Sequence, residues 1–147
     1  MILVIGYGNP LRCDDGAGVF VADELLKENI PGIQVITAHQ LHVELLEEAI
    51  KYEKVILVDA GEQEGGVLLR KVAPGTETPV TSSHHLGPEL FYGLAQKIYN
   101  KKLDLYVCSI KGENFEVGDK LSPPTLLRAK KALSLIASLF VKDLSYA

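Results

Sequence analysis

Short apolar runs alternate with segments of helical periodicity along almost the whole chain, and this alternation limits the fold more than any other feature. Short runs of aliphatic and β-branched residues, bounded by glycine or polar residues, predict buried strands. Five such runs occur, at residues 2–5, 33–37, 55–58, 67–72 and 103–110. Strands that alternate with helices are typical of an α/β protein with a mostly parallel sheet covered on both faces.

Helical periodicity fills the intervals between these runs. Apolar residues recur at near-helical spacing in four segments, at residues 16–28, 43–51, 88–100 and 123–139. The last segment has a clear start signal, because Ser122 is a good N-cap residue and Pro123 suits the first helical position. The predicted order is therefore β-α-β-α-β-β-α-β-α, with helices in layers on both sides of the sheet.

One connection breaks the alternation. Only residues 59–66 separate the third run from the fourth, which is too few for a crossover helix, since such a connection needs at least about 10–12 residues. We therefore expect the strand at residues 67–72 to pair antiparallel or to lie at an edge. The polar segment 73–83 contains two prolines and is predicted to be a mobile flap or a loop that contacts the substrate.

The composition is that of one ordinary globular domain. The chain has 147 residues, of which 47% are hydrophobic and 23% charged, and this predicts a single domain over residues 1–147. A net charge of −4 without a basic run argues against binding to nucleic acid or to anionic membranes. The N-terminus resembles a first strand more than a signal peptide, and no apolar stretch has the length of a membrane span. We expect a cytoplasmic protein that acts as a monomer.

A glycine-rich, acidic segment follows the first predicted strand, at the edge where open α/β sheets bind ligands. Residues 6–18 read Gly-Tyr-Gly-Asn-Pro-Leu-Arg-Cys-Asp-Asp-Gly-Ala-Gly. A dinucleotide site is disfavoured, because Leu11 replaces the third glycine and two acids would repel a pyrophosphate. Asp14 and Asp15 precede a predicted helix, whose positive end suits an acidic cap. One acid is enough for capping, so we expect one to cap the helix and the other to point into a cleft.

Two further segments are expected at the same edge. Asp59 directly follows the apolar run 55–58, a position that fits a functional acid and a turn acid equally well. His84 and His85 precede the helix predicted at 88–100, where one of them could be a ligand or a base. Asp15, Asp59 and one of these histidines would supply two carboxylates and one imidazole, a set that suits zinc, nickel, iron or manganese.

The remaining histidines and cysteines offer fewer possibilities. His39 and His42 could instead be ligands or could line the cleft, although the His-Glu-x-x-His zinc pattern is absent. The nucleophile elbow Gly-x-Ser-x-Gly, the Walker loop and the Cys-x-x-Cys motif are absent as well. Cys13 is next to two acids that disfavour its thiolate, and Cys108 lies inside an apolar run and is predicted to be a core residue.

Four motifs together resemble those of the NiFe hydrogenase maturation endopeptidases. The most specific one is Gly-x-Gly-Asn-x-Leu-x-x-Asp-Asp-Gly-x-Gly over residues 6–18. Three weaker motifs follow in the family's order and with matching spacing: Val58-Asp59-Ala60, Ser83-His84-x-Leu86-Gly87 and Leu121-Ser122-Pro123. The resemblance covers the chain from residue 2 to about residue 130.

This resemblance implies a twisted five-stranded sheet between helices and a specific endopeptidase activity. The family removes a C-terminal extension from the precursor of the hydrogenase large subunit after nickel has been inserted. Its metal-binding positions fall on Asp15, Asp59 and His84, which would bind the nickel of the precursor, or zinc or cadmium in its place. Asp15 and Asp59 are also the candidate catalytic residues.

The segment after the second predicted strand departs from the sequence of many family members. They carry an Asp-Gly-Gly-Thr-like stretch there, whereas this chain has His39-Gln40-Leu41. This sequence and the tandem His84-His85 are similar to the branch that serves NAD-linked and other cytoplasmic hydrogenases. We name His39, His85 and Asn9 as further candidate cleft residues.

The sequence leaves the mechanism and two rival functions open. Either a carboxylate or metal-bound water attacks the peptide while the precursor's nickel orients it, or a carboxylate acts as general base and nickel serves only for recognition. A metal carrier without hydrolytic activity would use the same three ligands. A small-molecule hydrolase or a nucleotide-binding, flavodoxin-like protein is a third alternative, and the missing third glycine and the acidic loop argue against nucleotide binding.

Overall fold

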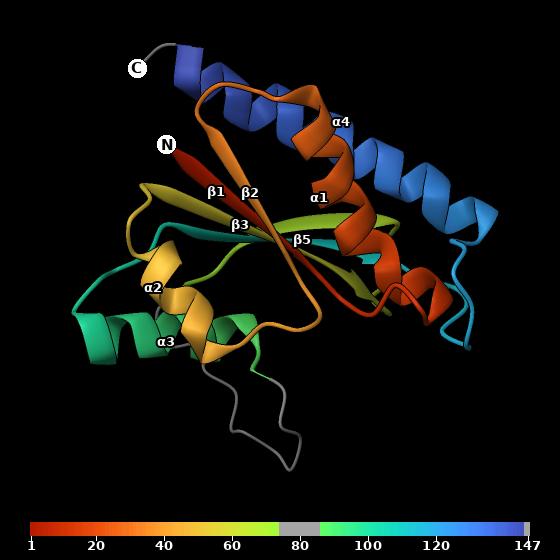
Figure 1. The fold of residues 1–147 in the computed structure, drawn as a ribbon, viewed down its shortest axis with the longest axis horizontal. Helices are drawn as coiled ribbons and strands as arrows, with labels where there is room; N and C mark the ends of the chain where they lie inside the picture. The colour runs from red at the N-terminus through yellow and green to blue at the C-terminus, as the bar shows by residue number, and fades with distance from the viewer. Residues whose placement is uncertain (74–85, 146–147) are drawn as a thin grey trace.

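Five strands form one sheet in the order β2-β1-β3-β5-β4 in the computed structural model, which describes residues 1–73 and 86–145 (Figure 1). These strands are β1 (Ile2–Tyr7), β2 (Ile33–Ala38), β3 (Lys54–Gly61), β4 (Val67–Lys71) and β5 (Leu105–Lys111). β1 pairs parallel with β2 and β3, and β3 pairs parallel with β5. β4 lies at the edge and pairs antiparallel with β5. The predictions of a mostly parallel sheet and of an exceptional strand near residue 67 are confirmed.

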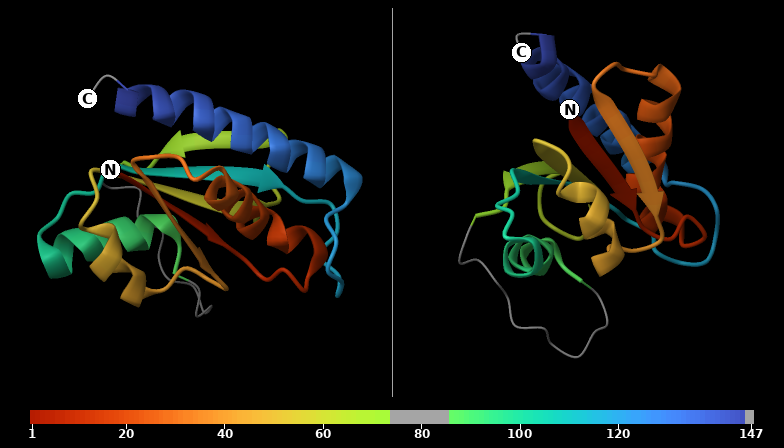
Figure 2. Two further views of the ribbon diagram at one scale, coloured as in Figure 1. Left: turned by 45° about the horizontal axis from the view of Figure 1, so that its top comes forward. Right: turned by 60° about the vertical axis from the view of Figure 1, so that its left-hand side comes forward.

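Helices cover both faces of this sheet and give the predicted three-layer α/β fold (Figure 2). α1 (Ala17–Glu28) and α4 (Pro123–Ser145) pack on one face, whereas α2 (Leu46–Ala49) and α3 (Pro88–Tyr99) pack on the other. Two short 3-10 turns, η1 (Cys13–Gly16) and η2 (Val43–Leu45), lead into α1 and α2. Among the helices of the described residues, none combines the length and apolarity needed to cross a membrane.

The alternation of side chains along the strands produces two separate apolar cores. On β1, Leu3 and Ile5 face the core under α2 and α3, where Phe91 is fully buried. Ile2 and Val4 face the core under α1 and α4, which includes α4's Ile136. The central strands are therefore apolar on both faces until the residues at their carboxyl ends.

Two helices differ in extent from the sequence prediction. The segment predicted as one helix over residues 43–51 consists of η2 and a single α-helical turn, α2. Its apolar face is real, since Leu46 and Ala49 are buried, but its first turn is a 3-10 turn and α2 ends at Ala49, two residues before the predicted end. α4 continues to Ser145, beyond the predicted end at residue 139.

Candidate active site

Three neighbouring strands place a polar side chain at the end of the same face. On β1 the buried residues Leu3 and Ile5 are followed, two residues on, by Tyr7, and on β3 Val55 and Leu57 are followed by Asp59. Ser109 continues the same series on β5, directly opposite Asp59 in the ladder. Because successive side chains of a strand point to opposite faces, all three side chains lie on the α2/α3 face.

These three side chains form one hydrogen-bonded group around the Asp59 carboxylate. The Tyr7 hydroxyl donates to Asp59 Oδ2 at 3.0 Å, and the Ser109 hydroxyl donates to Asp59 Oδ1 at 2.9 Å. Burial and the Asp59 carboxylate raise the pKa of Tyr7 well above its ordinary value, so the phenol keeps its proton and acts as the donor. Asp59 is thus held by one hydroxyl on each carboxylate oxygen.

The pKa of Asp59 is raised above its ordinary value. Burial is the main cause, and the negative charge of Asp15 adds to it. The two hydroxyl donors and the positive charge of Arg70 lower the pKa but do not cancel the rise. A carboxyl group with a raised pKa is a stronger base once ionised, which is the property expected of a general base.

Asp15 reaches the same end of the sheet from η1. The backbone N–H of Asn9 donates to Asp15 Oδ2 at 2.7 Å, and this bond ties the carboxylate to the glycine-rich segment. Gly8 has a φ of +141°, and a side-chain Cβ at this position would overlap the backbone oxygen of Asp15. Glycine is therefore required here both for its backbone conformation and for the close approach of Asp15.

Asp15 and Asp59 line one open cleft with a volume of about 410 Å³. The cleft lies between the glycine-rich segment, the segment after β2 and the start of α3. Its lining residues are Tyr7, Gly8, Asn9, Arg12, Asp15, His39, Gln40, Leu41, Asp59, Leu86, Gly87 and Pro88. Two carboxylates, a cationic side chain and an imidazole thus face one cavity at the carboxyl end of the parallel strands, the expected ligand-binding edge of such a sheet.

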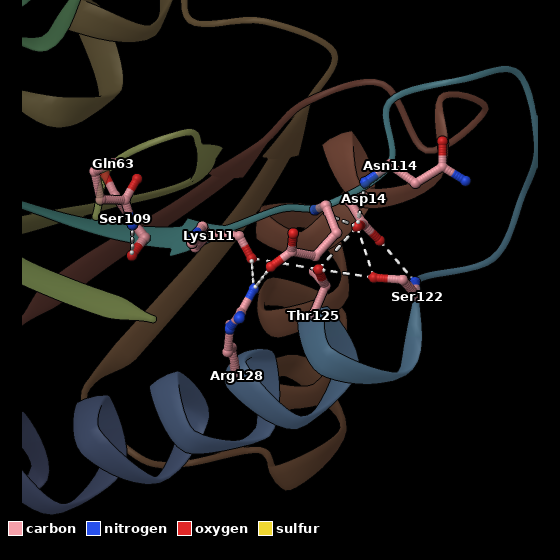
Figure 3. Close-up of polar contacts among 9 residues, drawn as sticks. Asp14, Gln63, Ser109, Lys111, Asn114, Ser122, Thr125 and Arg128 are labelled. Carbon is pink, nitrogen blue, oxygen red and sulfur yellow. Dashed lines mark hydrogen bonds and ion pairs between the residues drawn. The ribbon is translucent and has the colours of Figure 1, made fainter. Parts of the chain in front are cut away.

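Asp14 has a different environment from its neighbour Asp15. It is fully buried, and its carboxylate accepts five hydrogen bonds (Figure 3). The donors are the backbone N–H groups of Glu113, Asn114 and Ser122 and the hydroxyls of Ser122 and Thr125, at 2.7–2.9 Å. Burial alone would raise the pKa of Asp14, but these donors outweigh it and lower the pKa to about 2.

The expected capping of the following helix by one acid of this pair is wrong. Asp14 and Asp15 lie within η1, and neither η1 nor α1 has a side-chain cap. Asp14 instead binds the segment that leads into α4, which is more than 100 residues away along the chain. Ser122 does precede α4, as predicted, and its hydroxyl donates to Asp14.

The structure brings together some of the sequence-predicted site residues. Asp15, Asp59, Asn9 and His39 line the cleft. His42 precedes η2 and is not among the residues that line it. His84 and His85 lie outside the described residues, as does the loop predicted at residues 73–83 except for Ala73. Within residues 1–73 and 86–145, no three His, Cys, Asp or Glu side chains form a group that could hold a metal ion.

The sequence did not identify three residues as members of the site, namely Tyr7, Ser109 and Arg12. The first two could have been found from strand periodicity, since each continues a buried series at every second residue. Arg12 is an exposed side chain that lines the cleft, and nothing in its local sequence marks it. Cys108, by contrast, is fully buried as predicted, and burial raises the pKa of its thiol to about 12.

The chain is similar to several solved structures, although its sequence matches no protein-family model and no curated protein. The NiFe hydrogenase maturation protease HycI from Thermococcus kodakarensis KOD1 superposes with a TM-score of 0.74 at 21% identity, over 93% of this chain and 90% of that protein. The maturating endopeptidase HybD from E. coli superposes with a TM-score of 0.73 at 20% identity, over 97% of this chain and 93% of that protein. A hydrogenase 2 maturation peptidase from a Thaumarchaeota archaeon superposes with a TM-score of 0.71 at 22% identity, over 95% of this chain and 97% of that protein. The chain thus has the fold of these maturation proteases over nearly its full length.

Proposed function

We propose that the protein is an endopeptidase that removes the C-terminal extension of a NiFe hydrogenase large-subunit precursor after nickel insertion. The observation that carries this proposal is that Asp15 and Asp59 share one open cleft at the carboxyl end of the sheet. They do so in a chain whose fold is that of maturation proteases. The motifs at residues 6–18 and 58–60 that resemble this family are the ones that contribute these two carboxylates.

In this proposal Asp59 acts as the general base. Its carboxylate takes a proton from a water molecule, and the water oxygen forms a bond to the carbonyl carbon of the scissile peptide. The proton then passes to the leaving nitrogen as the C–N bond breaks. The raised pKa of Asp59 supports this role, because proton transfer is most effective when the pKa of the base approaches the working pH.

Nickel is part of the substrate in this proposal and not a resident cofactor. Asp15 and Asp59, with His84, would bind the nickel that the precursor carries and so orient the scissile bond; zinc or cadmium could occupy the same position. Three protein ligands would leave coordination positions open for donors of the precursor. The purified enzyme is therefore expected to hold nickel weakly. Stoichiometric nickel that survives a chelator would contradict this expectation.

The direct test is to incubate the protein with a nickel-loaded precursor and to weigh the products by mass spectrometry. We expect the loss of a C-terminal peptide, and no cleavage by Asp15→Ala. The matched control is Asp23→Ala, which removes an exposed carboxylate from α1 outside the cleft and should cleave normally. A nickel-free precursor should stay intact. An unchanged mass of the nickel-loaded precursor with the wild-type protein would contradict the proposal and favour a metal carrier.

A further inference from the structure

Two hydroxyls from the described part of the chain occupy only half of the hydrogen-bonding capacity of the Asp59 carboxylate. An ionised carboxylate has about four lone-pair positions, two on each oxygen. Tyr7 occupies one position on Oδ2 and Ser109 occupies one on Oδ1. Within residues 1–73 and 86–145, one position on each oxygen therefore has no hydrogen-bond donor, and Asp59 lines the cleft.

We infer that Tyr7 and Ser109 are positioning residues that lock the Asp59 carboxylate in one rotamer, with its free lone pairs directed into the cleft. This inference rests on the proposed function for its catalytic consequence. Neither residue is a specified position in the four motifs that resemble the maturation endopeptidases.

Both hydroxyls are carried by rigid elements. Ser109 is opposite Asp59 in the β3–β5 ladder and opposite Leu68 in the β4–β5 ladder, and Gln63 Nε2 donates to the Ser109 backbone carbonyl at 3.1 Å (Figure 3). Tyr7 ends β1 and its ring packs against the core under α2 and α3. Groups on such elements hold a neighbour more accurately than groups on loops.

The Asp59 side chain needs this support because it is the last residue of its series on the sheet face. Leu57 and Val55 behind it are packed on all sides, whereas Asp59 borders the cleft. Without its two donors the carboxylate could rotate about χ1 and χ2, and a displacement of about 1 Å at a reacting group can cost on the order of 100-fold in rate. The loss should appear mainly in kcat, because a displaced general base weakens an interaction that is made in the transition state.

The kinetic test compares Tyr7→Phe and Ser109→Ala with the wild type in the precursor cleavage assay. Each variant should lower kcat about 10-fold, and the double variant about 100-fold, with KM changed less than about twofold. Ser109→Thr keeps the hydroxyl and should restore most of kcat. The matched control is Tyr52→Phe, which removes another tyrosine-to-carboxylate bond, at 3.1 Å to Glu48, from a residue that is not among those lining the cleft. An unchanged kcat in Tyr7→Phe and Ser109→Ala would overturn the inference, as would a loss equal to that of Tyr52→Phe.

A spectroscopic readout separates this inference from the proposed function. Three-bond NMR couplings from Asp59 Cγ to its backbone nitrogen and carbonyl carbon report the χ1 rotamer. We expect a single rotamer in the wild type and rotamer averaging in the Tyr7→Phe/Ser109→Ala double variant. If the wild type leaves the precursor uncut, the proposed function fails and the couplings still decide on positioning. A single, unchanged rotamer in the double variant would refute the positioning role whatever the cleavage assay shows.

Discussion

Asp14 and Asp59 both lie near the carboxyl end of the sheet, yet their carboxylates have opposite surroundings. Asp14 is fully buried and accepts five hydrogen bonds from the segments around the start of α4. Asp59 accepts two from the residues that the structure describes, on the α2/α3 face, and borders an open cleft. The pKa of Asp14 is lowered to about 2, whereas that of Asp59 is raised. Hydrogen bonding and position thus separate a carboxylate that ties distant segments together from one that lines a cleft and for which we propose a catalytic role.

Asp14 and Asp15 are adjacent in the sequence but also differ in surroundings, since Asp14 binds the segment at the start of α4 and Asp15 lines the cleft. Both lie in η1, and in a 3-10 turn successive side chains are about 120° apart because three residues complete a turn. One side chain therefore enters the α4 contact while its neighbour reaches the cleft. Two adjacent acids at this position serve two separate purposes.

The largest expected effect is on activity, from Asp59→Asn. The amide cannot accept a proton as the carboxylate does, so we expect the cleavage rate to fall about 1,000-fold or more, equivalent to roughly 4 kcal/mol. The free energy of unfolding should stay within about 1 kcal/mol, because the substitution removes a partly desolvated charge. Cleavage kinetics and urea unfolding measure the two quantities. Asp23→Asn is the control, and retained activity in Asp59→Asn would remove Asp59 from the mechanism.

The converse substitution, Asp14→Asn, should act on stability. An asparagine side chain would turn an NH₂ donor toward groups that are themselves donors, so we expect a loss of about 3 kcal/mol in the free energy of unfolding. The folded fraction should keep its cleavage rate. Urea unfolding provides the measurement, with the exposed Asp119→Asn, between β5 and α4, as control. A stability loss below that of a typical surface substitution would show that the five bonds contribute little.

The free energy of unfolding should depend on pH in opposite directions through Asp14 and Asp59, because folding lowers one pKa and raises the other. This effect should be smaller than that of Asp14→Asn itself. The pKa of Asp14 falls from 3.8 to about 2 on folding, so its contribution is complete above about pH 5 and is lost as the pH falls through 2. The stability difference between wild type and Asp14→Asn should therefore shrink by about 2 kcal/mol between pH 5 and 2. Asp59 has the opposite sign, since a raised pKa makes its ionisation cost stability as the pH rises. If the difference in free energy of unfolding between the wild type and Asp14→Asn stayed constant with pH, this account would be contradicted.

The smallest expected effect comes from Gly8→Ala compared with Gly65→Ala. Both glycines have a positive φ, but a Cβ at Gly65 meets nothing within 4 Å, whereas one at Gly8 would overlap the Asp15 backbone. We expect Gly8→Ala to cost about 1 kcal/mol more than Gly65→Ala in thermal unfolding. Only Gly8→Ala should slow cleavage, because it displaces Asp15. Equal effects of the two variants would mean that the glycine-rich segment does not set the position of Asp15.

Much of the fold could be predicted, because strands buried on both faces appear as short continuous apolar runs whereas amphipathic helices repeat their apolar residues with a helical period. The short connection after Asp59 correctly indicated that β4 is exceptional. The role of Asp14 was not predictable, since its donors lie 99 to 111 residues further along the chain. The group formed by Tyr7, Asp59 and Ser109 also depends on strand order, because β1 and β5 become neighbours of β3 only in the folded sheet.

A carbon-13 NMR titration of the aspartate side-chain carboxyls tests the contrast between the two carboxylates most directly. The structure predicts that Asp14 titrates at a pKa of about 2 and that Asp59 titrates above its ordinary value of 3.8 in the same sample. Such a separation would show that one carboxylate is committed to the fold and the other is available to act as a base. Two coincident titrations near 3.8, or the reverse order, would contradict the account.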